Sequence, residues 1–138
     1  MNRARLEKQL TLDEGCKNKP YTDTVGKLTI GVGRNLDDRG LSADEIQLIL
    51  RNDIDIATRI CQKLIPTFDQ LDDVRQEVLV NMAFNLGQIR LAGFKKFLAA
   101  VAAGNFDLAS DEMLDSTWAT QVGERATRLA SAMEKGRF

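Results

Sequence analysis

A helical pattern ends at Gly15 and gives way within a few residues to a glycine-rich hairpin pattern, and this change constrains the fold most strongly. Leu6 and Leu10 are four positions apart, so residues 3–13 are predicted to form a helix, with glycine suited to its C-terminal stop. Residues 21–32 are short β-prone pieces with interspersed glycines, which favours a small hairpin sheet. The N-terminal part is therefore predicted to be a helix followed by a hairpin.

The rest of the chain has helical patterns. Ser42-Ala43-Asp44-Glu45 is a capping-box sequence, and the apolar spacing after it predicts a helix at about residues 43–64. Such a helix spans roughly 30 Å, enough to join two lobes. An apolar stripe predicted to be core follows at Val74, Val78, Leu79, Met82 and Leu86. Further helices are predicted from the cap at Asp72 to Gly87, over residues 94–103, and around residues 108–114 and 125–133. The fold class is α+β, mainly α, in one domain of 138 residues.

Charge and hydropathy exclude several classes of partner. The formal net charge is −1, which gives no overall electrostatic reason to expect nucleic acid or an anionic membrane. The N-terminus has basic residues but no apolar signal core, and no run of 18 apolar residues follows. We therefore expect a soluble protein made in the cytosol, without nucleic acid and without stable membrane association.

The soft metal ligands are few. Cys16 and Cys61 are 45 positions apart, and the chain has no histidine, so neither a zinc site nor another metal or cofactor is expected. A disulfide between the two cysteines stays open from sequence, although a cytosolic start favours free thiols.

Two carboxylates stand out at the change from helix to hairpin. Glu14 closes the predicted helix, and Asp23 lies nine positions on, at the turn of the hairpin. In a chain without histidine, carboxylates are the main candidates for general acid and general base. Two carboxyl groups on different structural elements are the minimum needed to cleave a glycosidic bond. Local chemistry alone also allows simpler roles: a solvated charge for Glu14, a turn residue for Asp23 and an ordinary strand residue for Thr29.

Several ordered motifs resemble the phage-type lysozymes of glycoside hydrolase family 24, specifically the T-even phage lysozyme branch. They are Asp13-Glu14-Gly15, Tyr21-x-Asp23-Thr24-x-Gly26, Thr29-Ile30-Gly31-Val32-Gly33 and Asn81-Met82-Ala83-Phe84-Asn85-Leu86-Gly87. The resemblance implies a lysozyme-like fold with an N-terminal αβ lobe (residues 13–58) and a helical lobe (residues 1–12 and 59–138). The long helix would join the lobes, with the active-site cleft between them.

The same resemblance implies the activity. It is hydrolysis of the β-1,4 bond between N-acetylmuramic acid and N-acetylglucosamine in peptidoglycan, with inversion. Glu14 would be the general acid, Asp23 the second carboxylate and Thr29 the hydroxyl that helps hold the attacking water. The implied protein is a monomeric endolysin in the host cytoplasm that depends on a holin to reach the wall and cause lysis.

Four further residues match or adjoin cleft positions of the family: Leu28, Phe84, Asn85 and Arg125. Asn85 stands where relatives have Gln, and Leu28 and Phe84 fit either core or cleft wall. Trp118 is interpreted as a packing anchor and not as a sugar platform.

The chain departs from the family pattern in three places. Arg34 stands where many relatives have histidine, and its partner position in the long helix is Asp53; an Arg-Asp pair stays charged where a His-Asp pair titrates, near pH 6.5. The connection over residues 35–41 is short for the T-even branch. The near-neutral net charge also weakens electrostatic capture by an anionic wall.

Two other functions stay open from sequence. A lytic transglycosylase also needs a catalytic glutamate, but it forms an anhydro-sugar without using water. A murein-binding module would keep the fold and lack catalysis. Asp23 and Thr29, which the family uses to hold water, argue against the transglycosylase, and the presence of Glu14, Asp23 and Thr29 together argues against the binding module.

Overall fold

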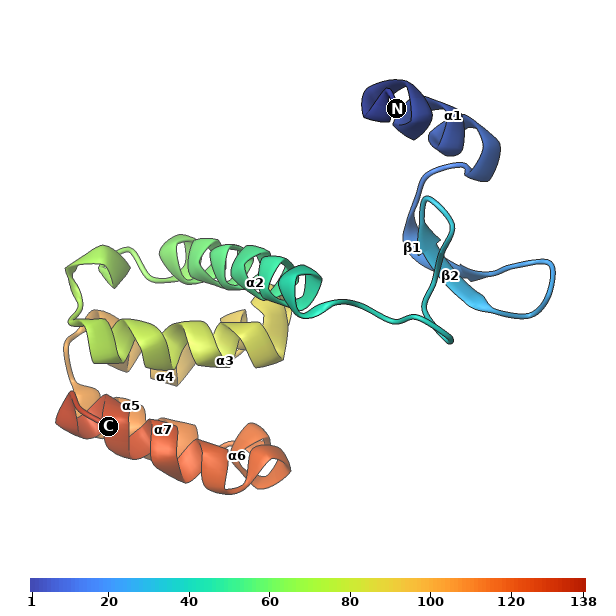
Figure 1. The fold of residues 1–138 in the computed structure, drawn as a ribbon. Coiled ribbons are helices and arrows are strands. Elements are labelled where there is room, and N and C mark those ends of the chain that lie inside the picture. Colours follow the sequence, from blue (N-terminus) through green and yellow to red (C-terminus); the bar gives the residue numbers. More distant parts are fainter. The chain divides into compact units, whose positions relative to one another are not determined.

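A computed structural model describes all 138 residues, and the chain divides within its long helix into two units, Met1–Leu48 and Ile49–Phe138. Figure 1 shows the first unit in blue to green and the second from green to red. The assignment of residues 1–12 to the helical lobe depends on how the units assemble, and it stays a prediction.

The predicted N-terminal helix is α1, Arg3–Glu14. Asn2 caps it by accepting a hydrogen bond from the Arg5 N–H at 2.9 Å. Gly15 ends it at a φ of 77°, and its N–H donates to the Thr11 carbonyl at 3.0 Å. None of the residues of α1 is buried.

The hairpin is part of a three-stranded antiparallel sheet in the order β1 (Lys17–Thr22), β2 (Leu28–Gly31) and β3 (Arg34–Asn35). Tyr21 pairs with Thr29, which in turn pairs with Asn35 on the other side. The sequence prediction missed β3 and the start of β1. Both are held by pairing with β2 and not by local β propensity, and the β1 register is irregular between Lys17 and Tyr21.

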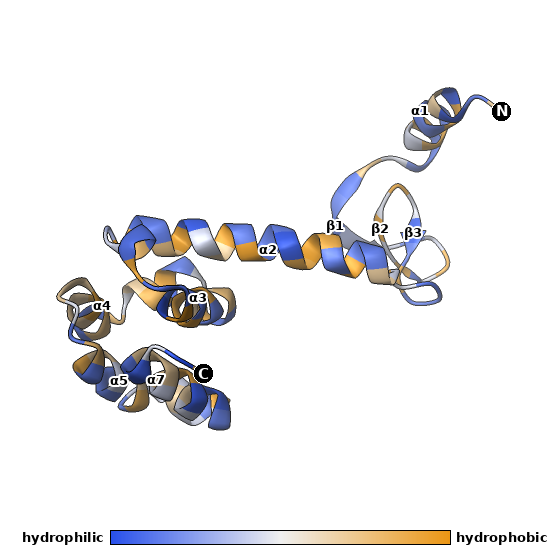
Figure 2. Cartoon of the chain, turned by 60° about the vertical axis from the view of Figure 1, so that its left-hand side comes forward, coloured by the Kyte–Doolittle hydropathy of each residue, from blue (hydrophilic) through white to orange (hydrophobic).

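The predicted long helix is α2, Ala43–Leu64. One of the two capping-box hydrogen bonds forms, from the Glu45 N–H to the Ser42 Oγ at 3.3 Å, while the Ser42 Oγ donates to Glu45 Oε1 at 3.0 Å. Figure 2 shows apolar residues recurring among polar ones along α2, and Ala57 and Cys61 on this helix are buried. No helix of the chain has both the length and the apolar character needed to cross a membrane.

The second unit continues with helices only. They are η1 (Phe68–Gln70), α3 (Asp73–Ala92), α4 (Lys95–Ala102), α5 (Phe106–Leu114), α6 (Thr117–Val122) and α7 (Glu124–Lys135). Gly87, predicted to end this helix, has a non-helical φ of 76° and ψ of 172°. It produces a kink and not an end, because the chain is helical again up to Ala92. The short elements η1 and α6 were not predicted.

Every buried apolar residue lies in the second unit, from Ala57 onward. Of the predicted stripe, Val78, Leu79, Met82 and Leu86 are buried and Val74 packs against them, so its core role is confirmed. Trp118 is 2% exposed, which confirms it as a packing anchor. The fold is mainly helical α+β, as predicted, with α1 and a small antiparallel sheet followed by helices.

Arg75 connects the first turn of α3 to the last turn of α7. Its Nε donates to the Met133 carbonyl at 2.7 Å and its Nη2 to the Glu134 carbonyl at 2.8 Å, while the guanidinium lies 3.8 Å above the Phe106 ring. Burial alone would raise the pKa of Asp72, but hydrogen bonds from the Arg75 backbone and side chain outweigh it and hold that pKa below its usual value. The interaction therefore satisfies two carbonyls that a helix end leaves without partners.

Candidate active site

Glu14 is the last residue of α1, and its carboxyl lies beside Gly33, in the turn between β2 and β3. A Cβ on Gly33 would be 3.1 Å from Glu14 Oε2 and 3.4 Å from its Cγ. Gly33 also has a φ of +69°, which disfavours any other residue. Glycine is therefore favoured here, mainly by its φ and also by the close approach of the Glu14 carboxyl.

Asp23 occupies the turn between β1 and β2 and is half-buried. Its Oδ1 accepts hydrogen bonds from the N–H groups of Val25 at 3.0 Å and Lys27 at 2.8 Å. Its own N–H donates to the Lys27 carbonyl at 2.9 Å. Asp23 is thus a turn residue, as local chemistry suggests, and its second carboxyl oxygen, Oδ2, is left free to act on a ligand.

Thr29 is 3% exposed and is the one buried residue of the first unit. Its Oγ1 donates to the Lys27 carbonyl at 3.0 Å. A hydroxyl has one hydrogen and two lone pairs, so towards a water molecule this side chain acts as an acceptor.

Lys27 brings Asp23 and Thr29 together. Its N–H donates to the Asp23 carboxyl, and its carbonyl accepts from both the Asp23 N–H and the Thr29 hydroxyl. Sequence reasoning gave Lys27 no role, because these interactions use its backbone and any residue type offers them.

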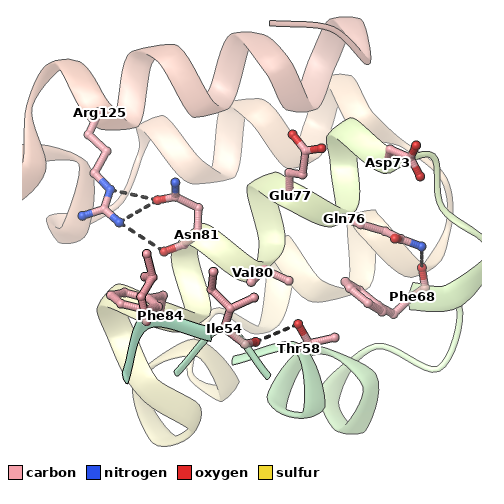
Figure 3. Close-up of a pocket in the computed structure, with 11 residues that line it drawn as sticks. Ile54, Thr58, Phe68, Asp73, Gln76, Glu77, Val80, Asn81, Phe84 and Arg125 are labelled. Carbon is pink, nitrogen blue, oxygen red and sulfur yellow. Dashed lines mark hydrogen bonds between the residues drawn. The ribbon is translucent and has the colours of Figure 1, made fainter. Parts of the chain in front are cut away.

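In the second unit, Phe84 and Arg125 line a groove of about 580 Å³ together with the apolar Leu50 and Ile54 of α2 (Figure 3). Asn81 holds Arg125 from α3: its Oδ1 accepts from Arg125 Nε at 2.9 Å and from Nη2 at 2.6 Å, and its carbonyl accepts from Nη2 at 3.3 Å. The remaining guanidinium nitrogen, Nη1, makes no hydrogen bond. Asn81 was missed as a site residue, although it opens the motif that ends at Gly87.

Asn85 lies on the exposed side of α3, and its Oδ1 accepts a hydrogen bond from Trp118 Nε1 at 2.8 Å. The buried indole thereby fixes the amide, whose NH₂ group remains free to donate. Leu28 is 40% exposed and belongs to the first unit. The four predicted substrate-binding residues are therefore divided, with Leu28 in the first unit and Phe84, Asn85 and Arg125 in the second.

Arg34 pairs with Glu45 in the first turn of α2, within the same unit, and its Nη1 also donates to the Gly40 carbonyl at 3.2 Å. Asp53, the partner expected from the sequence, belongs to the other unit, so that pairing stays a prediction. The hydrogen bond from Arg34 lowers the pKa of Glu45 and raises that of Arg34.

The soft ligands are not clustered. No three His, Cys, Asp or Glu side chains are grouped to hold a metal ion. Cys16 and Cys61 are both free thiols, and burial raises the pKa of Cys61 to about 12.

Comparison with known proteins adds the deciding observation. A sequence model of the phage lysozyme family matches residues 12–134, which include Glu14, Asp23, Thr29 and Arg125. The chain belongs to the phage lysozyme family. It is accordingly a glycoside hydrolase, and membership implies peptidoglycan as its substrate.

Similar proteins come from Dictyostelium discoideum and from a bacteriophage. Two proteins of Dictyostelium discoideum, "Probable T4-type lysozyme 1" and "Probable T4-type lysozyme 2", are 27% and 28% identical over 160 aligned positions, covering 95% of this chain and 94% of each relative. The "Pre-baseplate central spike protein Gp5" of Enterobacteria phage T4 is 26% identical over 95% of this chain and 28% of that protein. The 160 aligned positions exceed the 138 residues of the chain, so the Dictyostelium relatives have insertions relative to it.

Proposed function

We propose that this protein is an N-acetylmuramidase that hydrolyses the β-1,4 bond between N-acetylmuramic acid and N-acetylglucosamine, with inversion. The observation that supports the proposal is the family match over residues 12–134, which include Glu14 beside the β2–β3 turn and Asp23 and Thr29 on the same three-stranded sheet. Two carboxyls and a water suffice for an inverting cleavage without metal or cofactor.

Each proposed catalytic residue has a defined part. Glu14 donates a proton to the glycosidic oxygen as the bond to the anomeric carbon breaks. A water oxygen bonds to that carbon from the opposite face, and the Asp23 carboxylate takes the proton that the water loses. Thr29 accepts a hydrogen from the same water, since its own hydrogen is engaged by the Lys27 carbonyl. This leaves the water lone pair directed at the sugar.

The substrate-binding part of the proposal concerns donors and apolar surface. Arg125 offers Nη1 after Asn81 has engaged its other nitrogens, and Asn85 offers its NH₂ group after Trp118 has engaged its oxygen. Hydroxyl and acetamide oxygens of amino sugars accept such hydrogen bonds. Phe84 and Leu28 supply exposed apolar surface for sugar rings.

The lobe boundaries implied by the resemblance are also proposed: residues 13–58 for one lobe, and residues 1–12 with 59–138 for the other. The supporting observation is that α1 buries no residue, although Leu6 and Leu10 are apolar. Replacement of Leu6 and Leu10 by Asp would then lower the stability of the helical lobe; an unchanged unfolding midpoint would contradict the assignment.

Digestion of purified murein tests the activity. Hydrolysis yields fragments that have gained one water, and the first product of an inverting enzyme has the α configuration at its new reducing end. A lytic transglycosylase would instead give anhydro-sugar ends of lower mass, and a murein-binding module would give no fragments. Either result would replace the proposed function.

We also propose that the protein acts as a phage endolysin, as a monomer that accumulates in the host cytoplasm until a holin opens the membrane. The support is the likeness to the T-even lysozyme branch. Expression in a Gram-negative host would then give no lysis until the inner membrane is opened by chloroform or a co-expressed holin. Lysis by this chain alone would contradict the dependence on a holin.

A further inference from the structure

The short connection that follows β3 folds back onto the start of β2. The Leu28 N–H donates to Asp37 Oδ2 at 2.7 Å, and the Leu36 N–H donates to the Leu28 carbonyl at 2.7 Å. Next to them, Lys27 Nζ donates to Asp38 Oδ1 at 3.0 Å. Both backbone groups of Leu28 are thereby held by residues 36 and 37.

Asp38 is itself fixed in place. Its Oδ2 accepts from Asn35 Nδ2 at 3.0 Å, and its N–H donates to Asn35 Oδ1 at 2.9 Å. The hydrogen bond with Asp38 raises the pKa of Lys27 and lowers that of Asp38, so both groups stay charged over a wide pH range. The connection is therefore a hydrogen-bonded turn and not a loose loop.

The segment held in this way is the one that joins the two proposed catalytic groups on the sheet. Lys27 contacts the Asp23 carboxyl through its N–H and the Thr29 hydroxyl through its carbonyl. A peptide is planar, so the Lys27 carbonyl and the Leu28 N–H move as one rigid group. Asp37, which holds that N–H, consequently restrains the carbonyl on which Thr29 and the Asp23 backbone depend.

We infer that Asp37 is a positioning residue for the proposed hydrolysis, which fixes the Lys27–Leu28 peptide and with it the directions of the Asp23 carboxylate and the Thr29 hydroxyl. The inference rests on the proposed function. Asp37 makes no hydrogen bond with either group and has no part in the proposed chemistry. Side-chain packing does not fix the Lys27–Leu28 peptide, because Thr29 is the one buried residue of the unit. The hydrogen bond from the Leu28 N–H to the Asp37 carboxylate is charge-assisted and 2.7 Å long, and bonds of this kind are strong.

Kinetics of two variants and a control test the inference. Asp37→Ala removes the acceptor and is expected to lower kcat on murein by about 10- to 100-fold with KM little changed, the effect of a slightly misplaced catalytic group. Asp37→Asn keeps an oxygen acceptor and is expected to recover most of the rate. Asp44→Ala removes an exposed aspartate of the same unit whose side chain makes no hydrogen bond, so it is expected to match the parent.

Amide hydrogen exchange gives a second measurement that needs no substrate. In Asp37→Ala, exchange is expected to accelerate at Val25 and Lys27 as well as at Leu28, because loosening the peptide loosens the Asp23 carboxyl that these amides contact. Acceleration confined to Leu28, or a kcat loss equal to that of Asp44→Ala, would overturn the inference. If the parent protein releases no murein fragments, the proposed function fails, while exchange at Val25 and Lys27 still decides whether Asp37 restrains the Asp23 turn.

Discussion

Replacement of Thr29 by Val and by Ser separates a catalytic hydroxyl from an ordinary strand residue. Val keeps the branched shape and removes the hydroxyl, whereas Ser keeps the hydroxyl and removes the methyl group. If Thr29 accepts a hydrogen from the attacking water, the Ser variant retains most of the murein-cleaving rate and the Val variant loses most of it.

The structure predicts similar stability costs for the two variants. In Thr29→Val the Lys27 carbonyl still accepts the Asp23 N–H at 2.9 Å, so no acceptor is left without a partner and the cost is that of one net hydrogen bond, about 1 kcal/mol. Thr29→Ser loses one buried methyl group, worth about 0.8 kcal/mol. The rates should differ far more, because removal of one preorganised hydrogen-bonding group from a reacting centre costs about 100-fold or more.

Fragment release from purified murein gives the rate, and thermal unfolding followed by circular dichroism gives the stability of the same samples. The expected result is two variants of nearly equal midpoint with rates about 100-fold apart. A folded Val variant that cleaves murein as fast as the parent would refute the reasoning, and Thr29 would then be only a strand residue.

Four further outcomes are expected. Glu14→Gln should keep the fold and lose at least about 100-fold in rate, and retention of more than about a tenth would refute its role as general acid. The carboxyls of Glu14 and Asp23 should be roughly 6.5 to 9.5 Å apart in a crystal structure, and about 5 Å would favour a retaining mechanism. Arg75→Ala should lower the free energy of unfolding by about 3 kcal/mol in denaturant titrations, mainly through the two charged hydrogen bonds that it donates to carbonyls of α7. The exposed Arg128→Ala should cost less than about 0.5 kcal/mol, and equal losses would contradict this. Glu45 has a pKa below its ordinary 4.5, so its stabilising effect should be full above pH 4.5 and decline as the pH falls through the lowered pKa. In Glu45→Gln, the unfolding midpoint should therefore fall less between about pH 6 and about pH 3 than it does in the parent.

The helices with strong local signals were predictable. The capping box before α2, the apolar stripe of α3 and the glycine at position 87 are each read from a few neighbouring residues. The missed elements lack such signals. Helix α6 has six residues, too few for an apolar period, and β3 has two, which are strand only because they pair with β2.

The candidate site divides in the same way. Motifs located Glu14, Asp23 and Thr29, because their residue types and spacing are visible in the chain. The partners of these residues were not visible: Asn81 and Arg125 are 44 positions apart, and Lys27 acts through its backbone. The pairing of Arg34 with Glu45 was not predicted, because local patterns do not show which acidic residue of the long helix the hairpin meets.

The two units differ in what holds their geometry, and this decides what substitutions in each will change. The second unit contains all the buried apolar residues, so changes there act mainly on stability through packing. In the first unit one residue is buried, and the positions of Asp23 and Thr29 follow instead from a chain of hydrogen bonds through Lys27 to Asp37. Substitutions along that chain should therefore change the rate of cleavage far more than they change the unfolding midpoint. Hydrogen bonds depend steeply on distance and angle, so a polar network of this kind fixes direction well while contributing little net stability.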